Sequence, residues 1–263
     1  MNKCECNSDS DKLQKAFLKG ETDFLKCNNC GLFFREKFPS KDELELIYKN
    51  AYKSNNVLLG NTDQESPHFT LKAYSNYLYR KYASNLRKNI NILDFGAGAG
   101  GLIAEMNNLG LEVDGFEYSN EARIEALSQR NIVLFENLTN IPDNYYDLIC
   151  MIEVIEHLTK LQETLAGLKR AMKPGAKLFL TTPNRLGLRS LIEGGHWREA
   201  KKKFHLFLFD EKSIRFHLKM AGFSNVKRVV FGPVQNKGIV KYLYTRLTQF
   251  LYLSGSIYIE AEK

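Results

Sequence analysis

The segment Leu93–Gly101 limits the possible fold of this chain more than any other stretch of its 263 residues. It leaves a short apolar strand at 91–95 and places four glycines in the turn and at the start of a helix at 99–109. Glycine tolerates positive φ and has no Cβ, so such a turn lets the backbone approach a ligand closely. The segment therefore predicts an α/β unit with a binding site at the end of its first strand.

Strands and helices alternate after this turn. The expected strands are 112–116, 132–135, 147–152 and 177–181. The expected helices are 121–130, 160–172 and 210–221. Repeated β-α units of this length predict an α/β fold with a doubly wound, mostly parallel sheet and helices on both faces. Two further β-rich segments, 226–231 and 256–260, lie near the C-terminus.

The composition excludes several classes of protein. A hydrophobic content of 44% with 25% charged residues is ordinary for a globular chain and excludes disordered and low-complexity architectures. No apolar run reaches the roughly 18 residues of a membrane-spanning helix. The first seven residues are polar and lack the apolar core of a secretory signal, so we expect a cytoplasmic protein with reduced thiols.

The charge is unevenly distributed along the chain. Residues 157–263 contain 20 Lys and Arg against 7 Asp and Glu, whereas the preceding part is acidic overall. A basic half is typical of contact with nucleic acid, an anionic membrane or an anionic substrate, and equally of a plain solvated surface. Because no pattern of stacked aromatics between basic residues is present, we expect no nucleic-acid partner.

Four of the five cysteines form two close pairs near the N-terminus, Cys4 with Cys6 and Cys27 with Cys30. Two such pairs about 20 residues apart are how a zinc ribbon presents four thiolates, and in a reducing compartment they favour a metal over disulfides. The first pair is one residue shorter than the usual C-x-x-C, and four unrelated thiols are the alternative. Four thiolates leave no open coordination position, so we expect a structural Zn²⁺ in an extension at 1–38.

Two interpretations of the glycine-rich turn compete. Gly96, Gly98 and Gly101 satisfy G-x-G-x-x-G, the dinucleotide fingerprint, whereas Asp94 with alternate glycines satisfies D-x-G-x-G-x-G, a motif for S-adenosylmethionine. A carboxylate two residues before the first glycine is unfavourable beside a pyrophosphate but accepts hydrogen bonds from an ammonium group. Glu117, at the end of the second strand, suits a ribose in both interpretations. The acid at position 94 therefore favours S-adenosylmethionine.

Four segments in this order resemble class I S-adenosylmethionine-dependent methyltransferases, especially the ubiquinone-biosynthesis O-methyltransferase group. The segments are Leu93–Gly100, Gly115–Ser119, Asp147–Leu158 and Leu168–Ala176. The resemblance implies a seven-stranded, Rossmann-like sheet whose last strand is antiparallel. It places the methyltransferase domain at 66–263, after a helical connector and loop at 39–65. The N-terminal cysteine pairs resemble the zinc-binding extension of some relatives.

The resemblance also assigns roles to individual residues. Asp94, Gly96 and Gly98, with Gly100 completing the motif, would line the methionine and sugar side of the cofactor. Glu117 would hold the ribose, and Glu153 would face the methionine moiety. Tyr118 would pack against the adenine. Asn137 stands where the family usually has an Asp near the adenine amino group, and its amide oxygen can still accept a hydrogen bond.

Methyl transfer to a hydroxyl benefits from a general base, and the candidates are His157 and His205. The alternatives are a histidine held by a backbone carbonyl for His157 and a buried structural histidine for His205. Between the fifth strand and His205, the stretch 194–198 suggests a mobile lid that carries Trp197. The cluster 201–203 would attract an anionic acceptor or remain solvated.

These observations lead to one function and two rivals. We expect methyl transfer from S-adenosylmethionine to a small molecule, most plausibly a hydroxyl of a sugar, glycolipid or similar metabolite. The rivals are an NAD(P)-dependent oxidoreductase and a non-catalytic cofactor-binding module. The basic, aromatic stretch 238–252 would either contact a membrane surface peripherally or pack on the protein itself.

Overall fold

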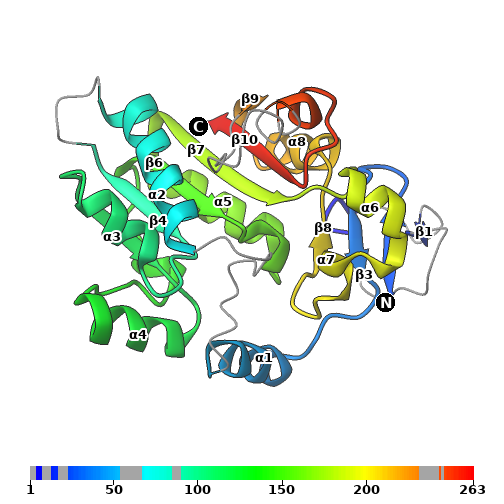
Figure 1. Cartoon of the computed structure of the whole chain (residues 1–263), viewed down its shortest axis with the longest axis horizontal. Helices are drawn as coiled ribbons and strands as arrows, with labels where there is room; N and C mark the ends of the chain where they lie inside the picture. Colours follow the sequence, from blue (N-terminus) through cyan, green and yellow to red (C-terminus); the bar gives the residue numbers. More distant parts are fainter. Residues whose placement is uncertain are drawn as a thin grey trace. The chain divides into compact units, whose positions relative to one another are not determined.

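The structure is a computed structural model that describes residues 4–7, 13–16, 23–53, 67–84, 90–230, 243 and 246–263. The chain forms two compact units. Unit 1 comprises Met1–Pro39, Glu153–Ala166 and Leu180–Glu262. Unit 2 comprises Ser40–Ile152, Gly167–Phe179 and Lys263. The elements of both units are labelled in Figure 1.

The principal sheet has six strands in the order β5-β4-β6-β7-β10-β9. Their bounds are β4 Ile92–Phe95, β5 Val113–Phe116, β6 Tyr146–Ile152, β7 Met172–Pro183, β9 Ser224–Arg228 and β10 Ser256–Glu262. Strand β4 pairs in parallel with β5 and β6. The last strand, β10, pairs antiparallel with β9. The expected fold class, an α/β Rossmann-like sheet that is mostly parallel, is confirmed.

The expected strand at 132–135 is reduced to a single bridge. Phe135 pairs in parallel with Phe116, and only two backbone bonds form: the Phe135 N–H donates to the Gly115 carbonyl and the Glu117 N–H donates to the Phe135 carbonyl. The segment therefore extends the edge of the sheet beside β5 without continuing as a ladder. In the described part of the chain, six of the seven expected strands are regular.

Unit 2 contains six of the described helices. They are α1 Lys41–Lys53, α2 Pro67–Leu78, the π-helix η2 Tyr79–Ala83, α3 Gly101–Asn107, α4 Asn120–Arg130 and the 3₁₀-helix η3 Leu138–Asn140, while α5 Leu161–Ala171 spans both units. Local capping explains two starts. Ser40 and Glu43 exchange side-chain hydrogen bonds with each other's backbone N–H before α1, and Ser119 Oγ accepts from the Ala122 N–H at α4.

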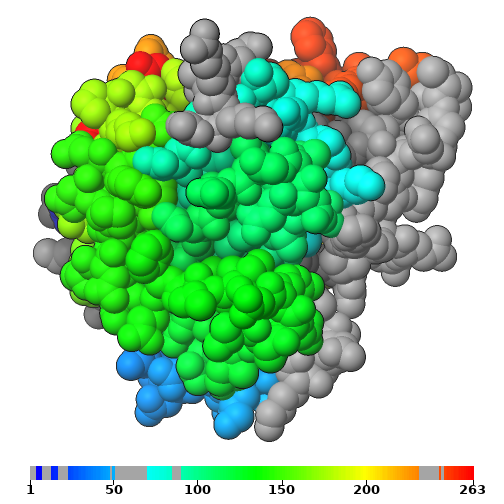
Figure 2. All heavy atoms as spheres, turned by 90° about the vertical axis from the view of Figure 1, so that its left-hand side faces the viewer, coloured from blue at the N-terminus to red at the C-terminus, as the bar shows by residue number. Residues whose placement is uncertain are grey.

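Aromatic and aliphatic packing holds the helices of unit 2 on its strands. Phe95 of β4 stacks on Phe116 of β5, with ring centroids 4.5 Å apart. Tyr74 and Tyr77 of α2 contact Phe179 of β7. A further apolar cluster joins the glycine turn to α3 and α4, and consists of Ala97, Ile103, Ala126 and Leu134. Figure 2 shows the solvent face of α3 and α4 in green.

Unit 1 has a second sheet that joins distant parts of the sequence. Its order is β1-β2-β3-β8, with bounds β1 Leu13–Lys15, β2 Phe24–Cys27, β3 Phe33–Arg35 and β8 Phe207–Leu208. Its helices are η4 Ile155–His157, α6 Leu188–Glu193, η5 Gly194–His196, α7 Arg198–Lys201 and α8 Glu211–Met220. The N-terminal strands thus share a sheet with β8, while the boundaries 1–38, 39–65 and 66–263 stay a prediction.

The expected lid at 194–198 is wrong in one respect. Trp197 is only 5% exposed and packs in the core of unit 1 with Phe24, Phe33, Ala200 and Leu208. The apolar ring therefore stabilises the small sheet instead of presenting an aromatic surface to a substrate.

The stretch 238–252 lies partly outside the described residues, which include only 243 and 246–252 of it. A short helix covers 246–250, and Leu247 and Phe250 are 55% and 75% exposed. Among the described helices, none has the length and apolar character needed to cross a bilayer. Peripheral membrane contact stays a prediction.

Gly115 is the tightest point in the packing of unit 2. A Cβ at this position would lie 2.3 Å from Leu134 Cδ2 and 2.5 Å from Ile103 Cδ1. We expect Gly115→Ala to lower the free energy of unfolding by about 1–3 kcal/mol, because both side chains must move within a packed core. Urea denaturation measures the change. The control is Gly255→Ala, whose Cβ would meet nothing within 4 Å, and equal stability of the two variants would contradict the packing argument.

Candidate active site

The glycine-rich turn after β4 folds back onto the end of β5. The N–H groups of Gly96 and Ala97 both donate to the Phe116 carbonyl, at 2.8 and 2.9 Å. Gly96 and Gly98 have φ of +83° and +55°, a region that residues with a Cβ rarely adopt. Gly100, also at positive φ, leads directly into α3. The sequence prediction of a strand, a tight turn and a helix is confirmed here.

The Glu117 carboxylate stabilises this turn through hydrogen bonds. Its Oε2 accepts from the Gly98 N–H at 2.9 Å, and its Oε1 accepts from the Ser119 N–H at 2.8 Å. Burial raises the pKa of Glu117, and these two backbone donors lower it in part. The residue that follows β5 therefore places its carboxylate directly against the glycine turn.

Asp94 is the second carboxylate of this site. It lies on β4 opposite Gly115 and Cys150 and is only 3% exposed. Burial and, less strongly, the charge of Glu117 raise the pKa of Asp94 to about 7. A cationic group bound beside these carboxylates would stabilise their ionised forms. The turn of unit 2 is thus suited to a ligand that carries positive charge.

Two residues expected at the adenine lie on the surface beside this turn. Tyr118 follows Glu117, is 60% exposed, and packs its ring edge-on against Phe116 at 4.7 Å. Asn137 is exposed and precedes η3, with its Nδ2 donating to Glu136 Oε1 at 3.3 Å. Both side chains are accessible to a ligand, and their roles stay predictions.

Glu153 directly follows β6 and has a strained backbone. Its φ is +55°, which costs a non-glycine residue about 1–3 kcal/mol. Thr181 of β7 holds it in place: the Glu153 N–H donates to the Thr181 carbonyl at 3.0 Å, and Thr181 Oγ1 donates to Glu153 Oε1 at 2.9 Å. Burial raises the pKa of Glu153 to about 7. Strain maintained by two strands at a buried carboxylate is typical of functional sites.

His157 is held by a backbone carbonyl, as one of the two sequence interpretations expects. Its Nδ1 lies 2.9 Å from the Phe204 carbonyl, which can only accept, so Nδ1 carries the proton. Burial lowers the pKa of His157 to about 4, and the ring is neutral near pH 7. The lone pair on Nε2, 3.8 Å from Glu156 Oε1, remains available for a proton or a metal.

His205 and Glu156 complete a buried cluster in unit 1. The His205 ring is 4.8 Å from that of His157 and only 2% exposed. Glu156 Oε2 accepts from Thr182 Oγ1 at 2.8 Å. Glu156 Oε1 and His205 Nδ1 are both buried without a hydrogen-bond partner among the described residues. Unpaired buried polar atoms are costly, so these two atoms are candidate ligands for a cation.

The ligand atoms of Glu156, His157 and His205 all lie within 4.8 Å of one another. Two imidazoles and a carboxylate at such spacing suit a divalent transition-metal ion. Lys202, a cation near this cluster, is paired with Glu199 at 2.6 Å. The sequence alone indicates the two histidines as bases and does not single out Glu156, although the spacing Glu153-x-x-Glu156-His157 gathers three donor residues around η4.

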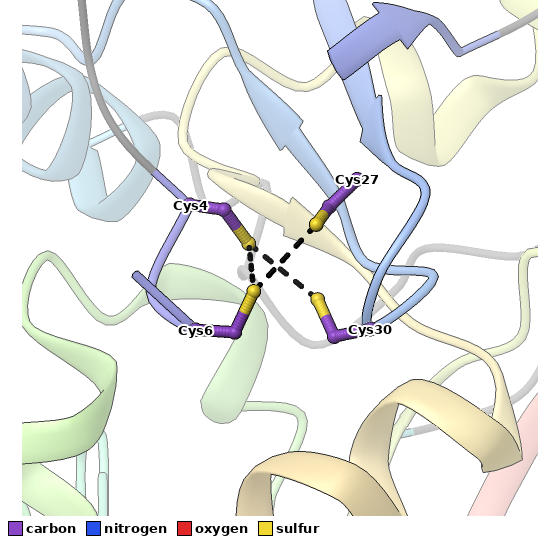
Figure 3. A group of neighbouring side chains, drawn as sticks. All are labelled: Cys4, Cys6, Cys27 and Cys30. Carbon is purple, nitrogen blue, oxygen red and sulfur yellow. Dashed lines mark hydrogen bonds between the residues drawn. The ribbon is translucent and has the colours of Figure 1, made fainter. Parts of the chain in front are cut away.

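A second cluster lies at the N-terminus of unit 1, where the four cysteines converge (Figure 3). Cys27 ends β2, and Cys30 lies in the turn before β3. The Sγ–Sγ distances are 3.3 Å for Cys4 and Cys6, 3.5 Å for Cys4 and Cys30, and 3.6 Å for Cys6 and Cys27. A Zn²⁺ with Zn–S bonds of about 2.3 Å separates its sulfurs by roughly 3.8 Å, so the donor set fits this ion.

His217 of α8 lies beside this cysteine cluster. The hydrogen bond with Cys4 and, less strongly, His217 lower the pKa of the Cys30 thiol to about 3, against burial, which raises it. His217 is fully buried, its Nδ1 lies 2.9 Å from Gln162 Nε2, and its Nε2 has no hydrogen-bond partner among the described residues. A thiolate next to an imidazole is the protonation state that a metal requires.

The strand order, the glycine turn and the acid that ends the next strand define a class I S-adenosylmethionine-dependent methyltransferase domain. A family model described as a methyltransferase domain matches residues 70–228. The chain belongs to this family. The expected class is therefore confirmed, and the match covers strands β4 to β9, the turn and the buried Glu156–His157–His205 cluster.

Several curated relatives are similar to part of the chain. The ubiquinone biosynthesis O-methyltransferase of Aeromonas salmonicida is 32% identical over 104 residues, which are 36% of this chain and 43% of that protein. The protein of the same name from Nitrosococcus oceani is 31% identical over 115 residues, 40% of this chain and 48% of that protein. The chain thus spans less than half the length of these relatives.

Solved structures share the fold at low sequence identity. A methyltransferase from Archaeoglobus fulgidus has a TM-score of 0.53 and 22% identity, with 73% of this chain and 94% of that chain covered. The [4+2]-cyclase SpnF has a TM-score of 0.60 and 15% identity, with 86% and 97% covered. Because the second is described as a cyclase, the fold alone does not determine the reaction.

The raised pKa of Asp94 makes a prediction about stability. The folded chain holds this proton more tightly than the unfolded chain, so the contribution of Asp94 favours folding at acidic pH and is lost as pH rises from about 4 to about 7. We expect Asp94→Asn to stabilise the ligand-free protein at pH 8, on the order of 1–4 kcal/mol, and much less at pH 5.

Melting temperatures of the variant and the wild type at the two pH values measure this difference. Glu112→Gln removes an exposed carboxylate that precedes β5 and serves as the control. A stabilisation by Asp94→Asn that is the same at pH 5 and pH 8 would contradict a buried, titrating Asp94.

Proposed function

We propose that the protein transfers the methyl group of S-adenosylmethionine to a hydroxyl of a small molecule, a sugar, a glycolipid or a similar metabolite. The observation that carries the proposal is the pair of carboxylates, the buried Asp94 and the partly buried Glu117, on either side of the glycine turn. They offer negative charge where S-adenosylmethionine presents its ammonium group and its ribose hydroxyls. The curated relatives named as O-methyltransferases support oxygen as the acceptor atom.

In this proposal the glycine turn and Glu117 bind the cofactor, with Gly96, Gly98 and Gly100 allowing its close approach. Asp94 and Glu153 face the methionine part. Tyr118 packs on the adenine, and Asn137 accepts from the adenine amino group.

The chemical step is an in-line displacement. A lone pair of the acceptor oxygen forms the new bond to the methyl carbon, and the electrons of the broken carbon–sulfur bond return to sulfur to give S-adenosylhomocysteine. The hydroxyl proton must leave during this step. His157 is suited to take it, because its Nδ1–H is fixed on the Phe204 carbonyl and its neutral Nε2 is free to accept.

We also propose that Glu156, His157 and His205 hold a divalent metal ion. The unpaired Glu156 Oε1 and His205 Nδ1 support this, since a cation satisfies both. When bound, such an ion lowers the pKa of a hydroxyl that it coordinates. If the metal is bound, His157 acts as one of its ligands; if no metal binds, His157 acts as the base. The second test below separates these two roles.

The nicotinamide-dependent rival receives no support from the glycine turn, because Asp94 would lie beside a pyrophosphate. The non-catalytic rival predicts cofactor affinity without turnover. We further propose that Zn²⁺ binds the four cysteines, as their convergence in Figure 3 suggests, and that the ion is structural.

Cofactor binding is the first test. We expect calorimetry to detect S-adenosylmethionine but not NAD, and Asp94→Asn to weaken the affinity for S-adenosylmethionine by about 10- to 100-fold, because a charge-assisted hydrogen bond is lost. Asp143→Asn, an exposed carboxylate of the same unit, is the matched control. Acceptors are then screened by release of S-adenosylhomocysteine. Preferential binding of NAD would disprove the proposal.

The second test separates the metal from the base. We expect His205→Ala to keep the affinity for S-adenosylmethionine, to lose turnover, and to weaken the binding of Mn²⁺ by at least about 10-fold, since one of three ligands is removed. Mn²⁺ binding is measured by electron paramagnetic resonance of the free ion. His196→Ala, an exposed histidine of η5, is the control. Turnover without any Mn²⁺ binding in the wild type would leave His157 as the base and exclude the metal.

A further inference from the structure

The cysteine cluster and the Glu156–His157–His205 cluster belong to the same unit and are connected by one small sheet. Cys27 ends β2, which pairs antiparallel with β3. Strand β3 pairs antiparallel with β8, through Phe33 with Leu208 and Phe34 with Phe207. His205 lies two residues before β8. A change in the cysteine turn can therefore reach the buried cluster through two ladders of backbone hydrogen bonds.

Arg35, the last residue of β3, connects the small sheet to the loop before β8 through its side chain. Its guanidinium is 6% exposed and donates to three backbone carbonyls. Nε donates to His205 O at 2.9 Å, and Nη2 donates to Ala200 O at 3.0 Å and to Lys202 O at 2.8 Å. Arg35 thus fixes the loop that carries His205.

The guanidinium itself is held from the opposite side. Nη1 forms an ion pair with the Asp23 carboxylate, and the group lies 4.5 Å above the centre of the Phe24 ring. Both residues precede Cys27 on or beside β2. The position of Arg35 therefore depends on the hairpin that the cysteine turn closes.

The backbone continues the connection to the other two ligands. The Arg35 N–H donates to the Leu206 carbonyl at 2.9 Å, and the Leu206 N–H donates to the Glu156 carbonyl at 2.8 Å. The Phe204 carbonyl accepts from His157 Nδ1. Residues 204–206 thus touch β3 through Arg35 and touch Glu156 and His157 directly. All three residues of the buried cluster are oriented by this segment.

A cation bound to the four sulfurs would hold the cysteine turn closed. Four sulfurs converge, and three of their Sγ–Sγ distances lie between 3.3 and 3.6 Å. The turn between β2 and β3 is otherwise held by two backbone bonds, from the Cys27 N–H to Leu32 O and from the Gly31 N–H to Cys27 O. Four thiolates without a metal would repel one another, whereas a Zn²⁺ bound to all four attracts each of them and holds them together.

We propose that a metal ion on the four cysteines keeps the Glu156–His157–His205 cluster in its ligating geometry, with Arg35 as the positioning residue between the two. The meaning of this coupling for turnover rests on the proposed function. The coupling itself is a property of unit 1 and does not require that any methyl group be transferred. The N-terminal cysteine segment is then a regulatory part of the acceptor side of the enzyme.

The test uses the full-length, zinc-loaded protein and two measurements that do not depend on activity. The first is hydrogen exchange of the backbone amides of 204–208. The second is the affinity for Mn²⁺, which prefers carboxylate and imidazole to a thiolate site. The variants are Arg35→Lys, which keeps the charge but loses the fork, and Cys6→Ser, which removes one thiolate.

We expect both variants to exchange the amides of 204–208 about 10- to 100-fold faster than the wild type and to bind Mn²⁺ about 10-fold more weakly, because the guanidinium that holds the carbonyls of Ala200, Lys202 and His205 is lost or displaced. Lys37→Ala, which removes an exposed cation two residues away, is expected to match the wild type. Asp23→Asn perturbs Arg35 from the surface and is expected to give a smaller change in the same direction. It keeps the test valid if Arg35→Lys unfolds.

Unchanged exchange across 204–208 in Arg35→Lys, Cys6→Ser and Asp23→Asn would overturn the proposal. Faster exchange together with intact affinity for S-adenosylmethionine would support it. Faster exchange in a protein whose wild type binds no Mn²⁺ would still support the coupling and would remove the metal from the proposed function. Failure of the coupling and failure of the proposed function are therefore distinguishable.

Discussion

Buried carboxylates at the ends of adjacent strands are the constraint on which the functional part of this structure depends. Asp94 on β4, Glu117 after β5, and Glu153 after β6 are each removed from water in part or in full, and burial raises the pKa of all three. Such groups cost free energy in a ligand-free protein. They are tolerated because backbone N–H groups, Thr181 and, in the proposal, a cationic cofactor compensate them.

The two clusters of unit 1 follow a different principle. The cysteines are gathered by a short hairpin, whereas Glu156, His157 and His205 come together because β8 pairs with β3 and Arg35 secures the loop before it. One cluster offers soft thiolates and the other offers imidazole and carboxylate, so the two suit different ions. The strands between them provide a physical route by which one site can organise the other.

The Rossmann-like fold was accessible from the sequence because its signals are local. The glycine turn, the capping residues Ser40 and Ser119, and the alternation of strands and helices each act within a few residues of the chain. The expectation of a regular strand at 132–135 was wrong, because a local pattern does not report how far a segment pairs with its neighbour. The β-rich composition of this segment does not reveal that it reaches the edge of the sheet for only one bridge, beside Phe116.

The sequence by itself determined the glycine-rich turn, with Asp94 and Glu117 as its carboxylates, and the two cysteine pairs. Each of these motifs is encoded by a fixed spacing along the chain. Only the tertiary structure decided that Trp197 is buried, that Arg35 reaches the carbonyls of the loop before β8, and that Glu156 joins His157 and His205. These contacts join residues up to 170 positions apart. No local pattern specifies them, since they depend on how the strands pair after the chain has folded.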